Sequence, residues 1–311
     1  MTTYPSILHE FVTTSPSLRP RSKQIYLHDV ERFVAFAGTE PSGWTLAKTR
    51  AFYQHLLAQG MKPQSANRIM RTVAFVAKWY ATEVGRPEAD FSKIQLASDG
   101  ETEPKNALTD EQARALLDTC GKREPKDVRD FALMVTALET GMRRMSLAGM
   151  TWEAFRPHAI EVPIKGYDKP YLVPLSDAAM TALDLWRTYL TTHRVPKKGP
   201  VFRALTSNLG GVTVGTGIST TSVYNIIHDR ATAVGLEVHP HLFRHTFITW
   251  RRMAGVSDAH IAAISAHRLP GDNSGQLYRY TDKKLLAEQA RKHTPAWLSV
   301  YVEKFCAGER P

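Results

Sequence analysis

The stretch Pro240-His241-Leu242-Phe243-Arg244-His245-Thr246-Phe247 combines cationic and apolar side chains at the start of a predicted helix. Proline is favoured in the first turn of a helix, so Pro240 indicates where this one begins. His241 and Arg244 are three residues apart and therefore share one face. An arginine presents a fork of donors to a phosphate, and a histidine beside it can donate a hydrogen bond or carry a proton. The pattern predicts a phosphate site, although an ordinary helix with exposed cations shares it.

A second basic pair, Arg143 and Arg144, follows the predicted helix stop at Gly141. The helix before it is predicted over residues 128–139, where apolar side chains are frequent. Basic residues at a helix end are commonly solvated. This pair, however, lies between two apolar stretches, where a charge is costly unless it is paired or used. Arg143 and Arg144 are therefore candidate site residues.

Further candidates lie after residue 247. His267 follows a predicted helix over 257–266, a place that the helix dipole alone favours for histidine. Tyr278 and Tyr280 lie beyond a Gly-Asp-Asn-Ser-Gly loop, where tyrosines ordinarily pack. The sequence has no Gly-rich phosphate loop, no paired carboxylates or histidine cluster at metal-ligand spacing, and no Gly-x-Ser-x-Gly elbow. The remaining set of cations and tyrosines suits attack on a phosphodiester without a metal or cofactor.

The composition of the 311-residue chain favours a polyanionic partner. Lys and Arg number 40 against 30 Asp and Glu, which gives a net charge of +10 and a pI near 9.6. Such a surface attracts nucleic acid, the alternative being a solubilising surface without a partner. The two cysteines, Cys120 and Cys306, are too few for a disulfide framework or a zinc site. No apolar run is long enough for a membrane helix, and the N-terminus does not resemble a signal peptide, so we expect a cytoplasmic protein.

The chain is predicted to divide into two domains. Residues 1–98 read as a helical bundle and carry 12 Lys/Arg against 7 Asp/Glu, a net charge of +5. Residues 99–106 are polar and read as a linker, and 107–311 form the second domain. In the bundle we expect helices over 20–38, 45–60 and from a cap at Ser65. In the second domain we expect a strand pair around the turn 165–170, a flexible loop over 207–220, a terminal helix, and helices over the ranges 128–139, 176–192, 219–234, 241–254 and 257–266.

Taken in order, these segments resemble the tyrosine recombinases of the phage integrase family. Thr140-Gly141-Met142-Arg143 resembles the family's Thr-Gly-Leu-Arg box, and residues 164–175 resemble the hairpin that carries its catalytic lysine. Residues 240–247 resemble the His-x-x-Arg-His-Thr box, residues 264–267 the Leu-Gly-His box, and Gln276-Leu277-Tyr278 the nucleophile segment. The family's acidic residue is replaced by Ser146, and Leu-Gly is replaced by Ser265-Ala266. Tyr278 lies eleven residues beyond His267, where the family usually has nine.

The resemblance implies a mainly α fold. Its parts are a helical, SAM-like core-binding domain and a mixed, mostly helical catalytic domain with a small β-hairpin or sheet. It also implies that the two domains close around duplex DNA.

The resemblance assigns a role to each candidate. Tyr278 is the nucleophile, with Tyr280 as the alternative, and Lys165 protonates the leaving 5′-oxygen, with Lys169 as the alternative. The remaining roles are these: Arg143 and Arg244 hold the phosphate, His241 moves the tyrosine proton, His267 donates a hydrogen bond to the phosphate, and Arg144 and Lys169 contact DNA. His245 is interpreted, like Arg144, as a structural or DNA-backbone residue. Arg68 and Arg71 are the expected DNA contacts of the first domain.

The expected partners are duplex DNA, further copies of the chain in a tetrameric synapse, and an accessory DNA-bending protein. Trp297, Tyr301 and Phe305 lie on one face of the terminal helix, which either docks on a neighbouring subunit or packs on its own domain. Two rival functions are a type IB topoisomerase and a DNA-binding regulator without catalysis. The DNA site and the kind of mobile element are left open by the sequence.

Overall fold

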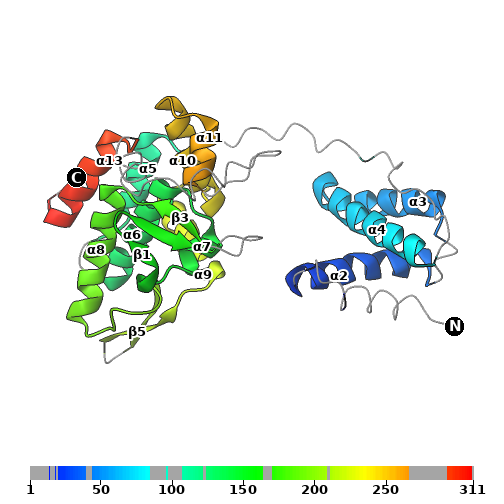
Figure 1. Cartoon of the computed structure of the whole chain (residues 1–311), viewed down its shortest axis with the longest axis horizontal. Coiled ribbons are helices and arrows are strands. Elements are labelled where there is room, and N and C mark those ends of the chain that lie inside the picture. The colour runs from blue at the N-terminus through cyan, green and yellow to red at the C-terminus, as the bar shows by residue number, and fades with distance from the viewer. Residues whose placement is uncertain are drawn as a thin grey trace. The chain divides into compact units, whose positions relative to one another are not determined.

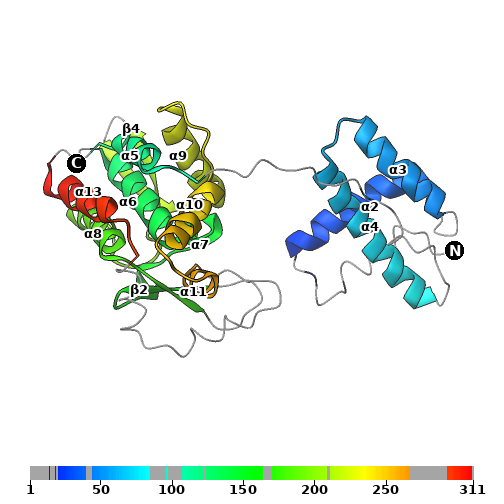
Figure 2. The ribbon, with the colours of Figure 1, turned by 90° about the horizontal axis from the view of Figure 1, so that it is seen from above.

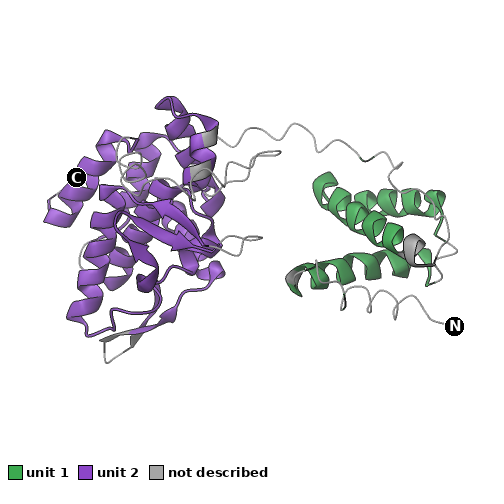
Figure 3. Cartoon of the chain, viewed as in Figure 1, with its two compact units in different colours: residues 1–103 green, residues 104–311 purple. Residues whose placement is uncertain are grey.

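The chain divides into two compact units, residues 1–103 and 104–311 (Figure 3). The computed structural model describes residues 20–39, 44–84, 107–121, 124–163, 170–208, 211–265 and 293–309, together with Thr14, Leu18 and Leu96. The division falls inside the segment predicted as a linker, and residues 99–106 themselves lie outside the described residues. None of the described helices is long and apolar enough to cross a bilayer.

The described residues of the first unit form three packed helices, α2 (Pro20–Ala37), α3 (Leu46–Ala58) and α4 (Pro63–Val84), as Figures 1 and 2 show. Aromatic rings hold its core, because Phe33 packs edge-on against both Trp44 and Phe52 at centroid distances of 5.1 and 5.2 Å. These three helices confirm the sequence prediction. The predicted cap at Ser65 is wrong: α4 begins two residues earlier at Pro63, whose fixed φ suits the first turn.

The second unit is mostly helical, as predicted, and its described residues form two small antiparallel sheets. Its elements in chain order are α5 (Asp110–Asp118), α6 (Pro125–Thr140), α7 (Arg144–Ala148), the 3-10 turn η3 (Trp152–Ala154), β1 (Phe155–Arg156), β2 (Ala159–Val162), β3 (Tyr171–Pro174), α8 (Asp177–Thr192), β4 (Arg203–Asn208), β5 (Gly211–Gly217), α9 (Thr220–Thr232), α10 (Pro240–Met253), α11 (Asp258–Ile264) and α13 (Ala296–Ala307).

Helix α6 forms the centre of this unit, and its residues from Val128 to Thr140 are all buried. It packs against α8 on one side and α10 on another (Figures 1 and 2). The predicted strand pair is confirmed as β2 and β3, with Ile160 opposite Val173, and β1 adds a third strand. The turn 164–169 lies outside the described residues.

The segment predicted as a flexible loop over residues 207–220 is instead part of a second hairpin. Strands β4 and β5 pair with Leu205 opposite Val214 and Thr206 opposite Thr213. The glycines of this segment suggested a loop, but its alternating Val and Thr residues favour extended backbone. Glycines are also compatible with a hairpin. The prediction of a flexible loop was wrong.

The C-terminal helix α13 packs on its own unit. Leu298, Tyr301, Val302 and Phe305 are at most 3% exposed, and the Phe305 ring stacks on Phe131 of α6 at 3.7 Å. Of the two alternatives, docking on a neighbouring subunit is therefore excluded for the buried side chains of Tyr301 and Phe305. The aromatic spacing reflects a helix that completes the core, which is the packing alternative left open by the sequence.

Candidate active site

Arg244 is the structural centre of the candidate site. It lies in the first turns of α10, and its side chain is only 2% exposed. Its Nη1 donates hydrogen bonds to the carbonyl oxygens of Gly141, at 2.6 Å, and Ser265, at 2.9 Å. Those two carbonyls lie at the C-terminal ends of α6 and α11, where helix dipoles concentrate negative charge. Two helix ends therefore hold the buried guanidinium in place.

Gly141 is required by the close approach of α6 to α10. Its φ is +58°, in the left-handed region, and a Cβ built on it meets the Phe247 ring at 2.7 Å. Phe247 is fully buried on α10, one turn beyond Arg244. Thr140 steadies the same turn, since its hydroxyl donates to the Thr136 carbonyl and accepts from the Met142 amide. This turn directs Arg143 out of the helix.

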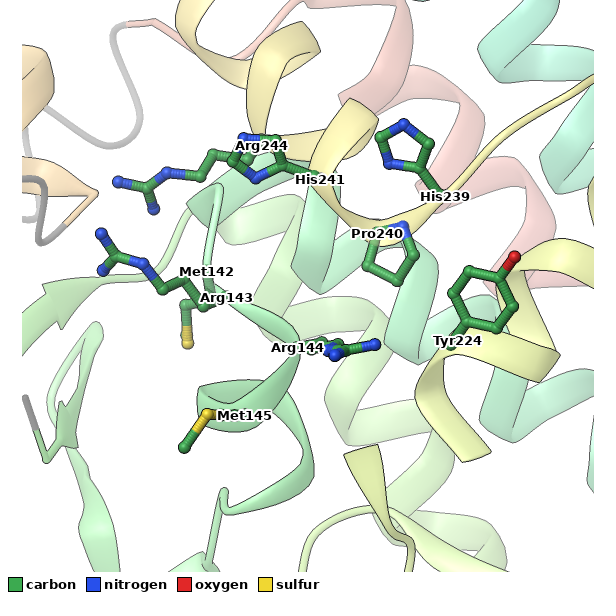
Figure 4. A pocket seen from close by; sticks show the side chains of 9 residues that line it. All are labelled: Met142, Arg143, Arg144, Met145, Tyr224, His239, Pro240, His241 and Arg244. Atoms are coloured by element: carbon green, nitrogen blue, oxygen red, sulfur yellow. The ribbon is translucent and has the colours of Figure 1, made fainter. Parts of the chain in front are cut away.

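Arg143 and Arg244 extend their guanidinium groups to the same side of the site, with His241 beside Arg244 (Figure 4). All three side chains line a cavity of about 360 Å³. The described residues that line it include no carboxylate and are Met142, Arg143, Arg144, Met145, Tyr224, His239, Pro240, His241 and Arg244. Three arginines and two histidines in the described lining favour an anionic ligand.

Burial and neighbouring charges set the protonation states here. Burial, with a smaller contribution from the Arg143 cation, lowers the pKa of Arg244 to about 10. Arg244 still carries its charge at neutral pH. The pKa of His241 is lowered below its usual value, first by burial and then by the charges of its neighbours, of which Arg244 and Arg143 are cations and His245 and His239 are further contributors. His241 is therefore neutral near pH 7 and can accept a proton.

Three contributors to this geometry were not singled out as site residues from the sequence. Ser265 uses its carbonyl to hold Arg244, while its hydroxyl donates to Ile261 and lies 3.4 Å from Nη2 of Arg244. Thr246 accepts from the Leu108 amide at 2.9 Å, which fixes the start of the unit to α10. His239 is the N-cap of α10 and accepts from the Leu242 amide. Thr246 belongs to the His-x-x-Arg-His-Thr box and Ser265 departs from the Leu-Gly-His box, whereas no signal in the sequence marked His239.

A buried ion pair ties the end of α6 to α10 behind this cavity. Nη2 of Arg251 lies 3.7 Å from Glu139, and its guanidinium covers the Phe247 ring. Thr294, just before α13, donates a hydrogen bond to the same Glu139 carboxylate. Two described residues that flank segment 266–292 are therefore linked to the end of α6. Ser265 is linked through Arg244, and Thr294 through Glu139.

The structure brings Arg143, His241 and Arg244 together, as predicted, and places Arg144 in the same cavity. His245 is exposed beside it, with its ring 5.1 Å from that of His241. The other predicted site residues lie outside the described residues: Lys165, Lys169, His267, Tyr278 and Tyr280. Within the described part of the chain, no group of three His, Cys, Asp or Glu side chains is arranged to hold a metal ion.

The two arginines predicted as DNA contacts in the first unit differ. Arg68 forms a bidentate ion pair with the buried carboxylate of Asp29, which also accepts from the Thr72 hydroxyl. That contact gives Arg68 a structural role. Arg71 is exposed and makes no hydrogen bond or ion pair with the described residues. Its role as a DNA contact stays a prediction.

Comparison with known proteins identifies the family. The model of the phage integrase family matches residues 106–284, more than half of the chain. The chain belongs to the phage integrase family. Among curated relatives of this family member, the tyrosine recombinase slr0733 of Synechocystis sp. is 24% identical over 297 residues, covering 90% of this chain and 91% of that protein. The tyrosine recombinase XerC of Oceanobacillus iheyensis is 25% identical and covers 92% and 94%.

Solved structures of integrases share the fold of this family member. A lambda integrase dimer bound to a COC′ core site matches with a TM-score of 0.67 at 16% identity, covering 89% of this chain and 95% of that one. The Tn1549 transposon integrase in complex with circular intermediate DNA also reaches 0.67 at 16% identity, covering 93% and 99%. The predicted mainly helical recombinase fold is confirmed.

Proposed function

We propose that this protein is a site-specific DNA recombinase that cleaves and rejoins duplex DNA through a 3′-phosphotyrosyl link. The observation that carries the proposal is the buried Arg244, held by two helix ends beside Arg143 and a neutral His241 in a cavity whose described lining has no carboxylate. The relatives that match most of the chain are named tyrosine recombinases, and structural neighbours are named as DNA complexes.

The two arginines supply the electrostatic part of the chemistry. When an oxygen attacks a phosphodiester, negative charge develops on the non-bridging oxygens of the phosphorus. Donors fixed in advance at those oxygens stabilise that state by about 3–4 kcal/mol each. Arg244 needs no reorganisation, because Gly141 and Ser265 already hold it. Arg143 lies on the same side of the cavity and completes the pair (Figure 4).

Proton transfer falls to His241 and to a lysine. In the proposed step the Tyr278 oxygen loses its proton to the neutral His241 and forms a bond to the scissile phosphorus. The bond to the 5′-oxygen breaks, and that oxygen takes a proton from Lys165. His267 donates a hydrogen bond to the phosphate. Tyr280 and Lys169 are the alternatives for nucleophile and acid. The phosphotyrosyl link conserves the phosphodiester bond energy, so rejoining needs no nucleotide.

Assembly on DNA follows from the same proposal. One structural neighbour is a lambda integrase tetramer bound to a Holliday junction, with a TM-score of 0.67. We therefore expect four copies of this chain to act together on two duplexes. An accessory DNA-bending protein and a cytoplasmic site of action stay predictions.

A covalent adduct tests the activity and names the nucleophile. The wild-type chain is incubated with fragmented DNA of its source, and adducts are isolated under denaturing conditions, so that sequencing identifies the cleaved site. A nicked substrate carrying that site then accumulates the adduct. Tyr278→Phe removes the attacking oxygen but keeps the ring, so we expect DNA binding without an adduct, whereas Tyr280→Phe keeps the adduct. Mass spectrometry of the DNA-linked peptide locates the link.

The rival functions give different results in the same experiment. A regulator without catalysis binds DNA and forms no adduct with any variant. A type IB topoisomerase forms the adduct and relaxes supercoils, but it exchanges no strands between two copies of the site. An adduct on Tyr280 corrects the nucleophile and leaves the recombinase proposal standing.

A further inference from the structure

Arg143 and Arg144 are neighbours in sequence, yet their side chains diverge. Arg143 precedes α7 with an extended backbone, at φ −69° and ψ 149°, and Arg144 is the first residue of that helix. Successive side chains of an extended chain point to opposite sides. Figure 4 shows the result: the Arg143 guanidinium lies by that of Arg244, whereas Arg144 extends the other way, toward Tyr224. The cavity therefore has two cationic ends.

The second end is built from three elements. Arg144 belongs to α7, Tyr224 to α9, and His239 caps α10, and all three line the cavity. Helices α7 and α9 pack against each other, so the fold fixes the spacing of the backbone at Arg144 and Tyr224. Arg144 is exposed and makes no hydrogen bond or ion pair within the described part of the chain.

The other two side chains add hydrogen-bond donors at this end. Tyr224 is 37% exposed, its ring stacks on His228 at 5.6 Å, and its hydroxyl donates to none of the described residues. Nδ1 of His239 accepts from the Leu242 amide at 3.3 Å. A ring nitrogen that accepts carries no proton, so the neutral ring holds its proton on Nε2, which is then a donor.

We propose that Arg144, Tyr224 and His239 bind a second phosphate of the DNA backbone, separate from the one held by Arg143 and Arg244. The inference rests on the proposed function, because it takes the scissile phosphate to lie at the Arg143 end. A guanidinium fork, a phenol and an imidazole N–H are all donors to non-bridging phosphate oxygens. Phosphate contacts fix the register of a protein on its duplex, so this second contact sets which phosphate reaches Arg244.

Salt dependence of binding counts the phosphates. The full-length wild type is compared with Arg143→Gln, Arg144→Gln, the double variant and Lys197→Gln, using a short duplex of unrelated sequence. Lys197 is an exposed cation that does not line the cavity, so its variant controls for charge alone. Each neutralised phosphate contributes about 0.9 to the slope of log affinity against log salt. We expect each single arginine variant to lose about 0.9 and the double variant about 1.8.

When the salt concentration rises from 50 to 200 mM, a variant that has lost one phosphate contact shows a fall in DNA affinity about 3.5-fold smaller than that of the wild type. A slope for Arg144→Gln equal to that of the wild type overturns the inference. So does a double variant that loses no more than Arg143→Gln, since both arginines then share one phosphate. A loss in Lys197→Gln equal to that in Arg144→Gln also overturns it, because general charge explains both.

Neutral phosphates locate the contact on the cleaved site recovered from the adduct. Methylphosphonates are placed one at a time around the scissile position, and the rate of adduct formation is measured. We expect one flanking position to slow the wild type and to have no further effect on Arg144→Gln or Tyr224→Phe. The scissile position stays sensitive in both variants. A flanking sensitivity unchanged by either variant, or absent from the wild type, refutes the second phosphate site while adduct formation itself still supports the proposed recombinase.

Discussion

Replacing Gly141 with alanine tests whether the end of α6 must touch α10 to place Arg244. The new Cβ lies 2.7 Å from the Phe247 ring, closer than any ordinary contact, and φ is +58°. The left-handed backbone costs an L-residue about 1–2 kcal/mol. Overpacking against a buried ring adds about 1–3 kcal/mol. We therefore expect Gly141→Ala to lower the free energy of unfolding of this unit by about 2–5 kcal/mol.

Gly235→Ala is the matched control. Gly235 also has a positive φ, of +68°, but its Cβ meets nothing within 4 Å. Only the backbone cost of about 1–2 kcal/mol applies there. The difference between the two variants isolates the contact with Phe247, and Phe247→Leu in the Gly141→Ala background recovers part of it by making room for the methyl group.

Calorimetry of the full chain measures the effect. For a unit of about 200 residues, each kcal/mol shifts Tm by roughly 2–4 °C. Gly141→Ala is expected to melt roughly 2–12 °C below Gly235→Ala, and to lose adduct formation out of proportion because the Gly141 carbonyl shifts away from Arg244. Equal Tm values for the two variants refute the idea that this contact constrains the turn.

Three further outcomes are expected. Adduct formation by the wild type falls as the pH drops below the lowered pKa of His241, since the protonated ring cannot accept the tyrosine proton, and His241→Gln removes that limb of the pH–rate profile. Deleting residues 295–311 removes four buried side chains of α13, and the loss of about 6–12 kcal/mol is expected to unfold the unit. Val300→Ser changes the exposed face of the same helix, so it leaves Tm unchanged and weakens synapsis only if that face contacts another subunit. Arg71→Ala lowers the slope of log affinity for DNA against log salt by about 0.9 and leaves Tm unchanged. Arg68→Ala destabilises the first unit by about 1–3 kcal/mol, because the buried Asp29 carboxylate loses two donors. Melting followed by circular dichroism distinguishes the two variants.

Local signals were enough to predict most of the helices and to single out Arg143, His241 and Arg244 as candidates for the site. Helix α5 begins with a capping box, because the Thr109 hydroxyl accepts from the Gln112 amide and the Gln112 side chain accepts from the Thr109 amide. Gly141 ends α6 in the left-handed conformation that glycine permits. Such signals lie within a few residues of the structure that they specify, so they can be read from one chain.

Tertiary contacts explain what the sequence did not reveal. The Gly141 carbonyl lies 103 residues before the arginine that it holds, and no local pattern marks a backbone oxygen as a site component. The aromatic spacing of α13 is the same whether the helix docks on its own unit or on another, so only the packing of Phe305 on Phe131 decides the matter. Segment 203–217 has glycines that fit a loop and β-branched residues that fit a hairpin.

The charge arrangement has one further consequence for how the site responds to pH. Arg244 has a pKa of about 10, so it stays cationic across the neutral range. The pKa of His241 is lowered, so the ring gains a proton only in acid, and acid therefore weakens the proposed proton transfer before it weakens phosphate binding by Arg244.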